Sequence, residues 1–175
     1  MVYRILLLSV FFISGLFASS SLENLKSFRA NFMQVVSSES NQTIEYKGKV
    51  FIKNSGKVLW KYETPIIKNV YVLDNVAIVD EPELEQAIYT TLENSIDIVK
   101  LLQDAKKIQK NKYEAILYDI KYTIILENEK IKSLSYNDQL ENKIVISFEK
   151  IEQNIEFSDE IFSFIAPDYY DIIKK

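Results

Sequence analysis

A change in hydrophobic period at residue 43 constrains the fold more than any other feature of this sequence. From there onward, apolar and polar side chains alternate with a period of two, which is the repeat of a β-strand with one buried face. One such segment covers residues 43–53, the turn-forming residues 54–56 follow, and a second alternating segment covers 57–62. We therefore predict a β-hairpin. Its facing pairs are Ile52 with Val58 and Val50 with Trp60.

The same alternation returns along most of the chain. Further strands are predicted over residues 70–73, 76–79, 87–91, 113–118, 121–126, 131–136, 143–151 and 161–165. A sheet of roughly ten strands must curl or split. We therefore expect a mainly β chain with some α-helix, built as a highly curved, incomplete antiparallel β-barrel.

Two segments have helical spacing instead. Ser20 is a capping residue with Glu23 three positions later, and apolar side chains then follow at helical spacing to residue 35. A second helix is predicted over residues 94–105. Two helices in a mostly β chain either pack on the sheet in the ordinary way or form a lid over its open mouth.

The first 18 residues have the order of a secretory signal peptide. Arg4 gives a short positive region, residues 5–17 are almost wholly apolar, and Ala18 precedes three serines. The alternative is an uncleaved membrane anchor, but the apolar run is short for a bilayer span. We predict cleavage after Ala18, one domain over residues 19–175, and export to the periplasm of a Gram-negative cell.

Composition excludes several classes of site. The 175 residues contain no Cys and no His, which excludes disulfides, thiolate nucleophiles, His-based catalytic triads and Cys or His metal sites. Three glycines cannot form a glycine-rich phosphate loop, and a net charge of −4 argues against a nucleic-acid partner. We predict no cofactor, no metal and no enzyme activity. The carboxylates around Pro82 are the feature on which a glycosidase alternative would rest.

Short motifs follow one another across most of the chain after residue 18. They are Phe28-x-Ala30-x-Phe32-x-Gln34, Gly48-x-Val50-x-Ile52, Trp60-x-Tyr62-x-x-Pro65, Val72-x-Asp74 and Phe162-x-Phe164-x-x-Pro167 with Asp171-Ile172-Ile173 behind it. Their order and spacing resemble the outer-membrane lipoprotein carrier proteins of the LolA family. The resemblance implies an incomplete β-barrel with a helical lid, whose cavity holds lipoprotein acyl chains. It also implies a monomeric carrier, loaded by an inner-membrane ABC transporter and unloaded by an outer-membrane acceptor.

With this resemblance, one face of the first hairpin and the apolar faces of the two helices become candidates for binding acyl chains. The residues are Phe28, Phe32, Val50, Ile52, Val58, Trp60, Tyr62, Ile98, Leu101 and Leu102. A plain hydrophobic core is the alternative interpretation of the same residues. If Val58 lines a cavity, the substitution Val58→Glu should abolish cargo loading and leave the fold intact.

The family often has Arg-Pro just after the second strand, where this chain has Asn54-Ser55. The resemblance links that Arg to lid closure and cargo release. Lys53 is the nearest cation, so Lys53 and Asn54 are the candidates for this role, although a Lys lacks the planar fork of Arg. The lysines on the outer face of the hairpin are either solvated or a docking surface for an acidic partner or anionic lipid headgroups. They are Lys47, Lys49, Lys53, Lys57 and Lys61.

The sequence leaves two functions open for such a scaffold. One is a periplasmic chaperone that shuttles lipoproteins from the inner to the outer membrane. The other is a periplasmic lipid-binding or sensor module with a different lipid ligand, because a fold does not determine a function.

Overall fold

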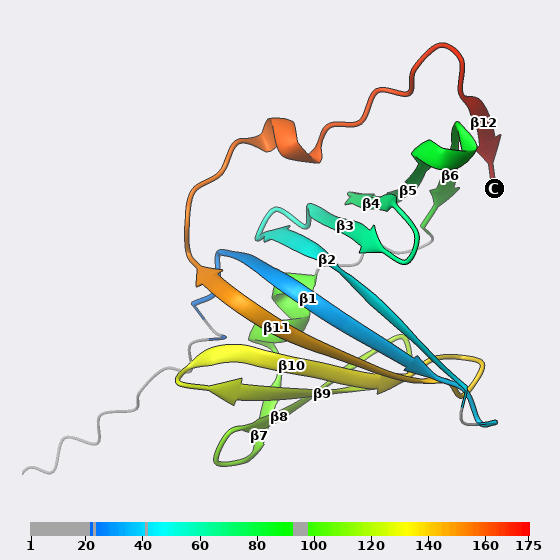
Figure 1. Cartoon of the computed structure of the whole chain (residues 1–175). Coiled ribbons are helices and arrows are strands. Elements are labelled where there is room, and N and C mark those ends of the chain that lie inside the picture. The colour runs from blue at the N-terminus through cyan, green and yellow to red at the C-terminus, as the bar shows by residue number, and fades with distance from the viewer. Residues whose placement is uncertain (1–21, 23, 41, 93–97) are drawn as a thin grey trace, which may run out of the picture.

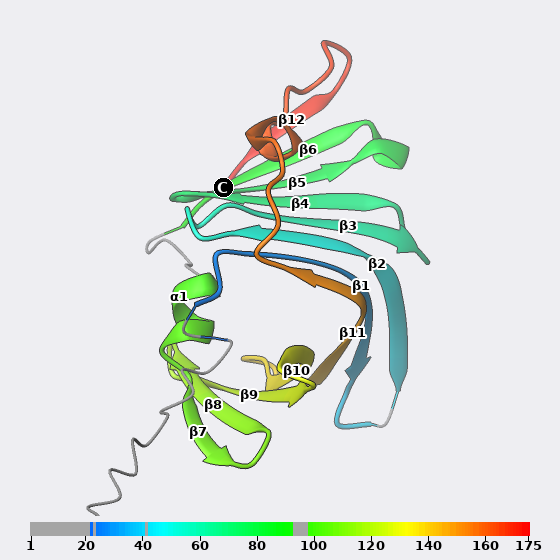
Figure 2. The same cartoon turned by 90° about the vertical axis from the view of Figure 1, so that its left-hand side faces the viewer.

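The computed structural model describes residues 22, 24–40, 42–92 and 98–175, and these form one open 12-stranded sheet. The strand order is β12-β6-β5-β4-β3-β2-β1-β11-β10-β9-β8-β7, so β12 and β7 are unjoined edges. Figure 2 shows how strongly the sheet curves. Neighbouring strands are antiparallel, except that β12 runs parallel to β6. The bounds are β1 Ser27–Ser37, β2 Thr43–Lys53, β3 Val58–Thr64, β4 Lys68–Leu73, β5 Val76–Glu81, β6 Gln86–Thr91, β7 Lys106–Gln109, β8 Lys112–Leu117, β9 Ile120–Glu127, β10 Lys130–Asn137, β11 Lys143–Gln153 and β12 Asp171–Lys174.

The first predicted hairpin is confirmed with its register. Ile52 lies opposite Val58, and Val50 lies opposite Trp60. The Lys53 N–H donates to the Lys57 carbonyl at 2.9 Å, which closes the turn. Gly56 has a φ of 82°, a backbone conformation that glycine adopts without steric cost. The local turn chemistry therefore determined the pairing here.

The helix predicted from Ser20 to residue 35 is wrong, because most of this segment is strand β1. The two spacings coincide: Phe28 and Phe32 share a face in a helix, and they also share a face in a strand with Ala30 between them. β1 lies centrally in the sheet and pairs along its length with both β2 and β11. These two ladders satisfy the backbone on both sides, which outweighs the local preference for helix. Phe28 and Phe32 thus belong to the sheet and not to a lid.

The second predicted helix is observed in part. Helix α1 covers Ile98–Gln103, and the predicted start at Asn94 lies outside the described residues. Figure 2 places α1 on the concave side of the curved sheet. Within the described ranges, no helix combines the length and the apolar character needed to cross a membrane.

The strand predicted over residues 161–165 is also wrong. Residues 154–170, which we name the C-terminal strap, leave β11 and arch back over the sheet to β12 (Figure 1). The strap contains a short 3-10 helix, η2, over Asp159–Phe162. Phe162 is only 2% exposed and packs against Leu59, Tyr71 and Ile78. The strap was misread because its apolar residues serve long-range packing and not a ladder.

The sheet therefore has a hydrophobic layer on each face. The larger layer, on the concave face, includes α1 and the inward side chains of β1, β2 and β8–β11. The smaller layer, on the convex face, forms between strands β2–β6 and the strap. Period-two alternation gives both layers from the same strands, since successive side chains point to opposite faces.

Candidate functional site

An apolar cavity of about 300 Å³ lies on the concave face. Strands β1–β4 and β8–β11 form its wall, and α1 contributes from the side of the opening. The lining side chains are Phe28, Gln34, Ile52, Trp60, Tyr62, Val70, Val72, Leu101, Leu102, Leu117, Tyr122, Ile131, Leu134, Tyr136, Ile146 and Phe148.

The structure divides the residues predicted from the sequence into two groups. Those that line the cavity are Phe28, Ile52, Trp60, Tyr62, Leu101 and Leu102. Phe32, Val50 and Val58 are at most 3% exposed and belong to the core around the cavity, not to its lining. Ile98 begins α1, and its side chain lies outside the described part of the chain.

Sequence reasoning missed the half of the wall that comes from β8–β11. The missed residues include Leu117, Tyr122, Leu134, Tyr136 and Phe148. A signal was present, because the alternation in each of these predicted strands already separated an apolar face from a polar one. What the alternation could not show is that these strands close onto the first hairpin through the β1–β11 pairing.

Aromatic contacts support the wall of the cavity. The Phe32 ring lies edge-on to Trp60 and Tyr62, with centroid distances of 5.0 and 5.1 Å. Phe28 contacts Phe148 in the same way at 5.2 Å, which joins β1 to β11. Edge-to-face pairs of this kind add to stability beyond the area they bury. Phe32 therefore positions two cavity residues without itself reaching the cavity.

The lining is electrically neutral. None of the described side chains that line the cavity is charged. The Tyr62 hydroxyl donates to Gln34 Oε1 at 2.9 Å, and burial raises the pKa of Tyr62 to about 12. Burial also raises the pKa of Tyr122 and of Tyr136. These phenols therefore stay protonated at physiological pH and add no charge to the lining.

Helix α1 is held at the cavity mainly by apolar packing. Leu101 and Leu102 are 7% and 4% exposed and pack into the concave layer. One side-chain hydrogen bond, from Gln103 Nε2 to the Leu25 carbonyl at 2.9 Å, ties the end of the helix to the segment before β1. A helix of this length depends on such tertiary contacts, because it is too short to be stable alone.

Lys53 ends β2 and Asn54 follows it, beside the segment before β1 to which Gln103 of α1 is also bonded. The Lys53 Nζ is 2.5 Å from Asp159 Oδ1, and the Lys57 Nζ is 3.0 Å from the other oxygen of the same carboxylate. Hydrogen bonds from these two lysines lower the pKa of Asp159. The Asn54 backbone N–H donates to the Lys26 carbonyl at 2.8 Å. Lys53 is thus engaged with the C-terminal strap on the convex side.

Two other lysines of this face form exposed ion pairs. Lys49 pairs with Glu63 at 3.1 Å, and Lys47 pairs with Glu45 at 2.8 Å. Phe51 and Leu59, which interrupt the lysines in the sequence, belong to the layer covered by the strap. This face is therefore partly a seat for the protein's own chain and partly a surface of paired charges.

Comparison with known proteins places these features in a family. The family model described as "Outer membrane lipoprotein carrier protein LolA" matches residues 23–119. A relative from Wolinella succinogenes, named outer-membrane lipoprotein carrier protein, is 36% identical over 98% of this chain and 99% of its own. One of the same name from Campylobacter jejuni is 35% identical over 93% of this chain and 94% of its own.

Solved structures show the same fold at low sequence identity. A LolA superfamily protein from Nitrosomonas europaea has a TM-score of 0.53 at 13% identity, over 83% of this chain and 96% of its own. An uncharacterized conserved protein from Thermus thermophilus has a TM-score of 0.54 at 4% identity, over 90% of this chain and 95% of its own. From the family match and the relatives that cover nearly its whole length, the chain belongs to the LolA family of outer-membrane lipoprotein carrier proteins.

Proposed function

We propose that this protein is a periplasmic carrier that binds the acyl chains of lipoproteins released from the inner membrane and delivers them to the outer membrane. The observation that carries the proposal is the uncharged apolar cavity on the concave face of a LolA-family chain. The residues proposed to contact the acyl chains are the sixteen that line it, and Phe32, Val50 and Val58 are proposed to hold them in place.

The energetics of lipid transfer explain why such a cavity is needed. Each methylene that leaves a bilayer for water costs about 0.8 kcal/mol, and two or more chains anchor a protein firmly. A lipoprotein with several acyl chains therefore needs an apolar host to cross an aqueous space. The host must also release its cargo, and release runs down an affinity gradient toward an acceptor with the higher affinity.

The size of the cavity argues for opening during loading. A water molecule takes about 30 Å³ of the liquid, so a cavity of about 300 Å³ has room for roughly ten groups of methylene size. This is part of one acyl chain. The helix at the opening is α1, which is attached through buried apolar side chains, among them Leu101 and Leu102, and through the Gln103 bond. We therefore assign α1 the role of a lid that moves outward when lipid enters.

The proposed function also requires two partners and removal of the signal peptide. The sequence carries no glycine-rich phosphate loop, so the energy for loading comes from a partner, an inner-membrane ABC transporter. An outer-membrane acceptor takes the cargo. Residues 1–18 are cleaved as a signal peptide, and the remaining chain binds and releases lipid without catalysing a reaction.

Native mass spectrometry tests the function directly. The full-length precursor is expressed in its own cell, and the protein is purified from the periplasm without detergent. We expect a fraction of it to carry an acylated polypeptide, and we expect the same protein to solubilise lipoproteins from inner-membrane vesicles that contain the transporter. If only free phospholipid or glycolipid copurifies, and vesicles release nothing to it, the protein is a lipid-binding module of another kind.

A further inference from the structure

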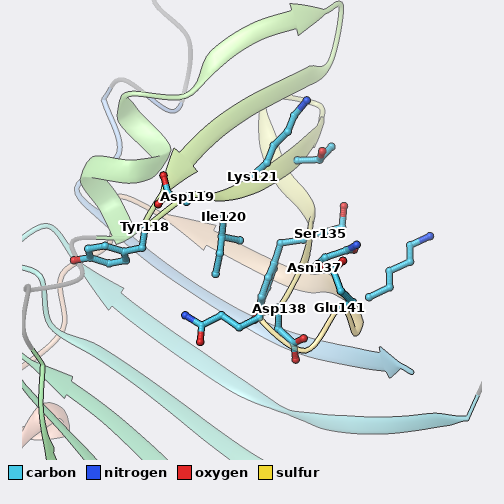
Figure 3. A pocket seen from close by; sticks show the side chains of 12 residues that line it. Tyr118, Asp119, Ile120, Lys121, Ser135, Asn137, Asp138 and Glu141 are labelled. Atoms are coloured by element: carbon cyan, nitrogen blue, oxygen red, sulfur yellow. The ribbon is translucent and has the colours of Figure 1, made fainter. Parts of the chain in front are cut away.

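A second pocket, polar in character, lies where strands β9 and β10 separate. Their ladder ends at the pair of Thr123 and Ser135. Strand β9 nevertheless begins at Ile120, and β10 continues to Asn137. The pocket occupies this separation and has a volume of about 650 Å³ (Figure 3). This size is within the range of clefts that bind small organic ligands.

The separation leaves strand edges without a neighbour. Ile120 is still paired with Leu117 of β8, and Asn137 is still paired with Lys143 of β11, so both strands keep their outer ladders. Backbone groups alternate between the two sides of a strand, so those that point into the gap have no ladder to join. Such edges are templates for an added extended peptide.

The polar pocket adjoins the apolar cavity at one residue. Tyr136 lines both of them, and its ring lies against Tyr122, with a centroid distance of 4.9 Å. The gap and the apolar cavity are therefore neighbours along β9 and β10. The lining changes there from hydrocarbon to hydroxyl groups, carboxylates and amines, which suit a peptide and not an acyl chain. Among these residues are Asp119, Lys121, Thr123, Ser135, Glu141 and Lys143.

One wall of the pocket is preformed. The Asp138 carboxylate accepts hydrogen bonds from the backbone N–H groups of Leu140 and Asn142 and from the Asn142 side chain, each at 2.9 Å. The bond from the Asn142 side chain is the main cause of the lowered pKa of Asp138. The turn beside the gap is therefore held in shape before any ligand arrives, which reduces the ordering cost of binding.

We propose that this gap seats the extended polypeptide segment directly behind the lipid-bearing N-terminal residue of a lipoprotein cargo. The segment hydrogen-bonds through its backbone to the free edges of β9 and β10 while the acyl chains occupy the apolar cavity. Backbone pairing depends on the extended conformation of the peptide and not on its side chains, so the gap can bind cargo of different sequences. The inference rests on the proposed carrier function.

The test compares two probes on the mature protein. One is tripalmitoylated cysteine amide, and the other is the same lipid with a short, neutral, polar peptide extension. Affinities are measured by displacement of an apolar fluorophore, and hydrogen exchange is followed at the amides of residues 120–123 and 136–137. We expect the extension to strengthen binding about tenfold, the equivalent of one or two net hydrogen bonds, and to protect these amides.

A matched pair of variants sharpens the test. Asn137→Trp fills the gap, so it should remove the gain from the extension and leave binding of the lipid amide unchanged. Asn111→Trp places the same exposed substitution at the end of a neighbouring hairpin, outside both pockets, and should keep the gain. The exchange measurement on the unchanged protein stands even if Asn137→Trp fails to fold.

The outcomes separate the two proposals. If both probes bind equally and the extension adds no protection in the gap, the peptide seat is wrong and the carrier function stands. If neither probe binds, the carrier function and the peptide seat are both overturned.

Discussion

The concave and convex faces of this sheet both carry apolar side chains, but these side chains are kept from water in different ways. Both faces of β2–β5 carry apolar side chains, and both are partly covered. On the convex face the chain covers itself, because the C-terminal strap inserts Phe162 among Leu59, Tyr71 and Ile78 and leaves each of them at most 8% exposed. On the concave face the short helix α1 contributes Leu101 and Leu102, and a cavity of about 300 Å³ remains.

The difference shows which layer is filled and which leaves unfilled space. Dispersion contacts are lost at every unfilled boundary, so the concave layer gives up stabilisation that the convex layer keeps. The Lys53–Asp159 and Lys57–Asp159 ion pairs add a polar attachment for the strap on the filled side. Under the proposed function this asymmetry has a use, because the unfilled face stays available to a ligand while the strap fills the other face.

The sharpest contrast within the concave layer is between two residues that lie opposite each other. Val58 on β3 pairs with Val72 on β4, but Val58 is fully buried and Val72 lines the cavity. An unpaired charge at Val58 has no access to water, so Val58→Glu should cost more than about 4 kcal/mol and prevent folding. This replaces the expectation from the sequence that the variant keeps its fold. Circular dichroism and urea unfolding of both variants measure the effect.

Val72→Glu is the matched control. Its carboxylate can reach the cavity, so the fold should persist while binding of an acylated probe is lost. A cooperative, native-like Val58→Glu protein would show that the core around the cavity is looser than its burial indicates.

The filled convex face is tested by Phe162→Ala. Removal of this ring leaves a void between the strap and the sheet and should lower the free energy of unfolding by about 3–5 kcal/mol. Acyl-probe binding by the folded fraction should not change, because the ring lies on the other face. Tyr169→Ala, at a strap residue that is 68% exposed, should stay within about 0.5 kcal/mol of the parent in the same urea titration. Equal losses from the two substitutions would argue against a packed strap.

The open concave face is tested by Leu134→Trp, which adds volume to the wall of the cavity. A filled cavity competes with the ligand, so affinity for an acylated probe should fall at least about tenfold, equivalent to about 1.4 kcal/mol. Stability should change little, because the added ring occupies existing space. Leu140→Trp, at a site that is 79% exposed, serves as the control and should bind normally. Unchanged affinity in Leu134→Trp would place the acyl chains elsewhere.

The smallest expected effect concerns the ion pairs of the strap. Hydrogen bonds from Lys53 and Lys57 lower the pKa of Asp159, so the ionised form favours the folded state. This contribution is present above the ordinary carboxyl pKa of about 3.9 and is lost as pH falls through the lowered value. Asp159→Asn should therefore lower the urea midpoint slightly at neutral pH, and the difference from the parent should vanish in acid. A constant difference across this range would assign the effect to packing.

Local chemistry was enough for much of the fold. The first hairpin was predictable with its register because residues 54–56 form a turn and the flanking alternation admits one pairing that buries Val50 and Ile52 together. The turns at residues 74–75 and 127–129 similarly located β4, β5, β9 and β10. With the family resemblance, three residues of the cavity wall followed from the hairpin, Ile52, Trp60 and Tyr62, and three from the two predicted helices, Phe28, Leu101 and Leu102.

The sequence pattern gave a wrong prediction where the spacing of apolar residues fits both a helix and a strand. Leu22 and Leu25 suggested a helix, but they form only a hydrogen-bonded turn, with 3.1 Å between the Leu25 nitrogen and the Leu22 oxygen. Phe28 and Phe32, four residues apart, fit a helix and a strand equally well. Pairing with β11, which lies more than 100 residues further along the chain, decided between them.

The sequence by itself determined where most of the strands and turns occur, the absence of cysteine and histidine chemistry, and the family to which the chain is related. These are properties of short segments and of composition. The tertiary structure alone decided that β1 is a central strand, that the strap covers one face, and that Val58 is core while Val72 meets a cavity. The reason is physical: each of these depends on which distant segment supplies the neighbouring atoms, and a sequence pattern specifies an apolar face without specifying what covers it.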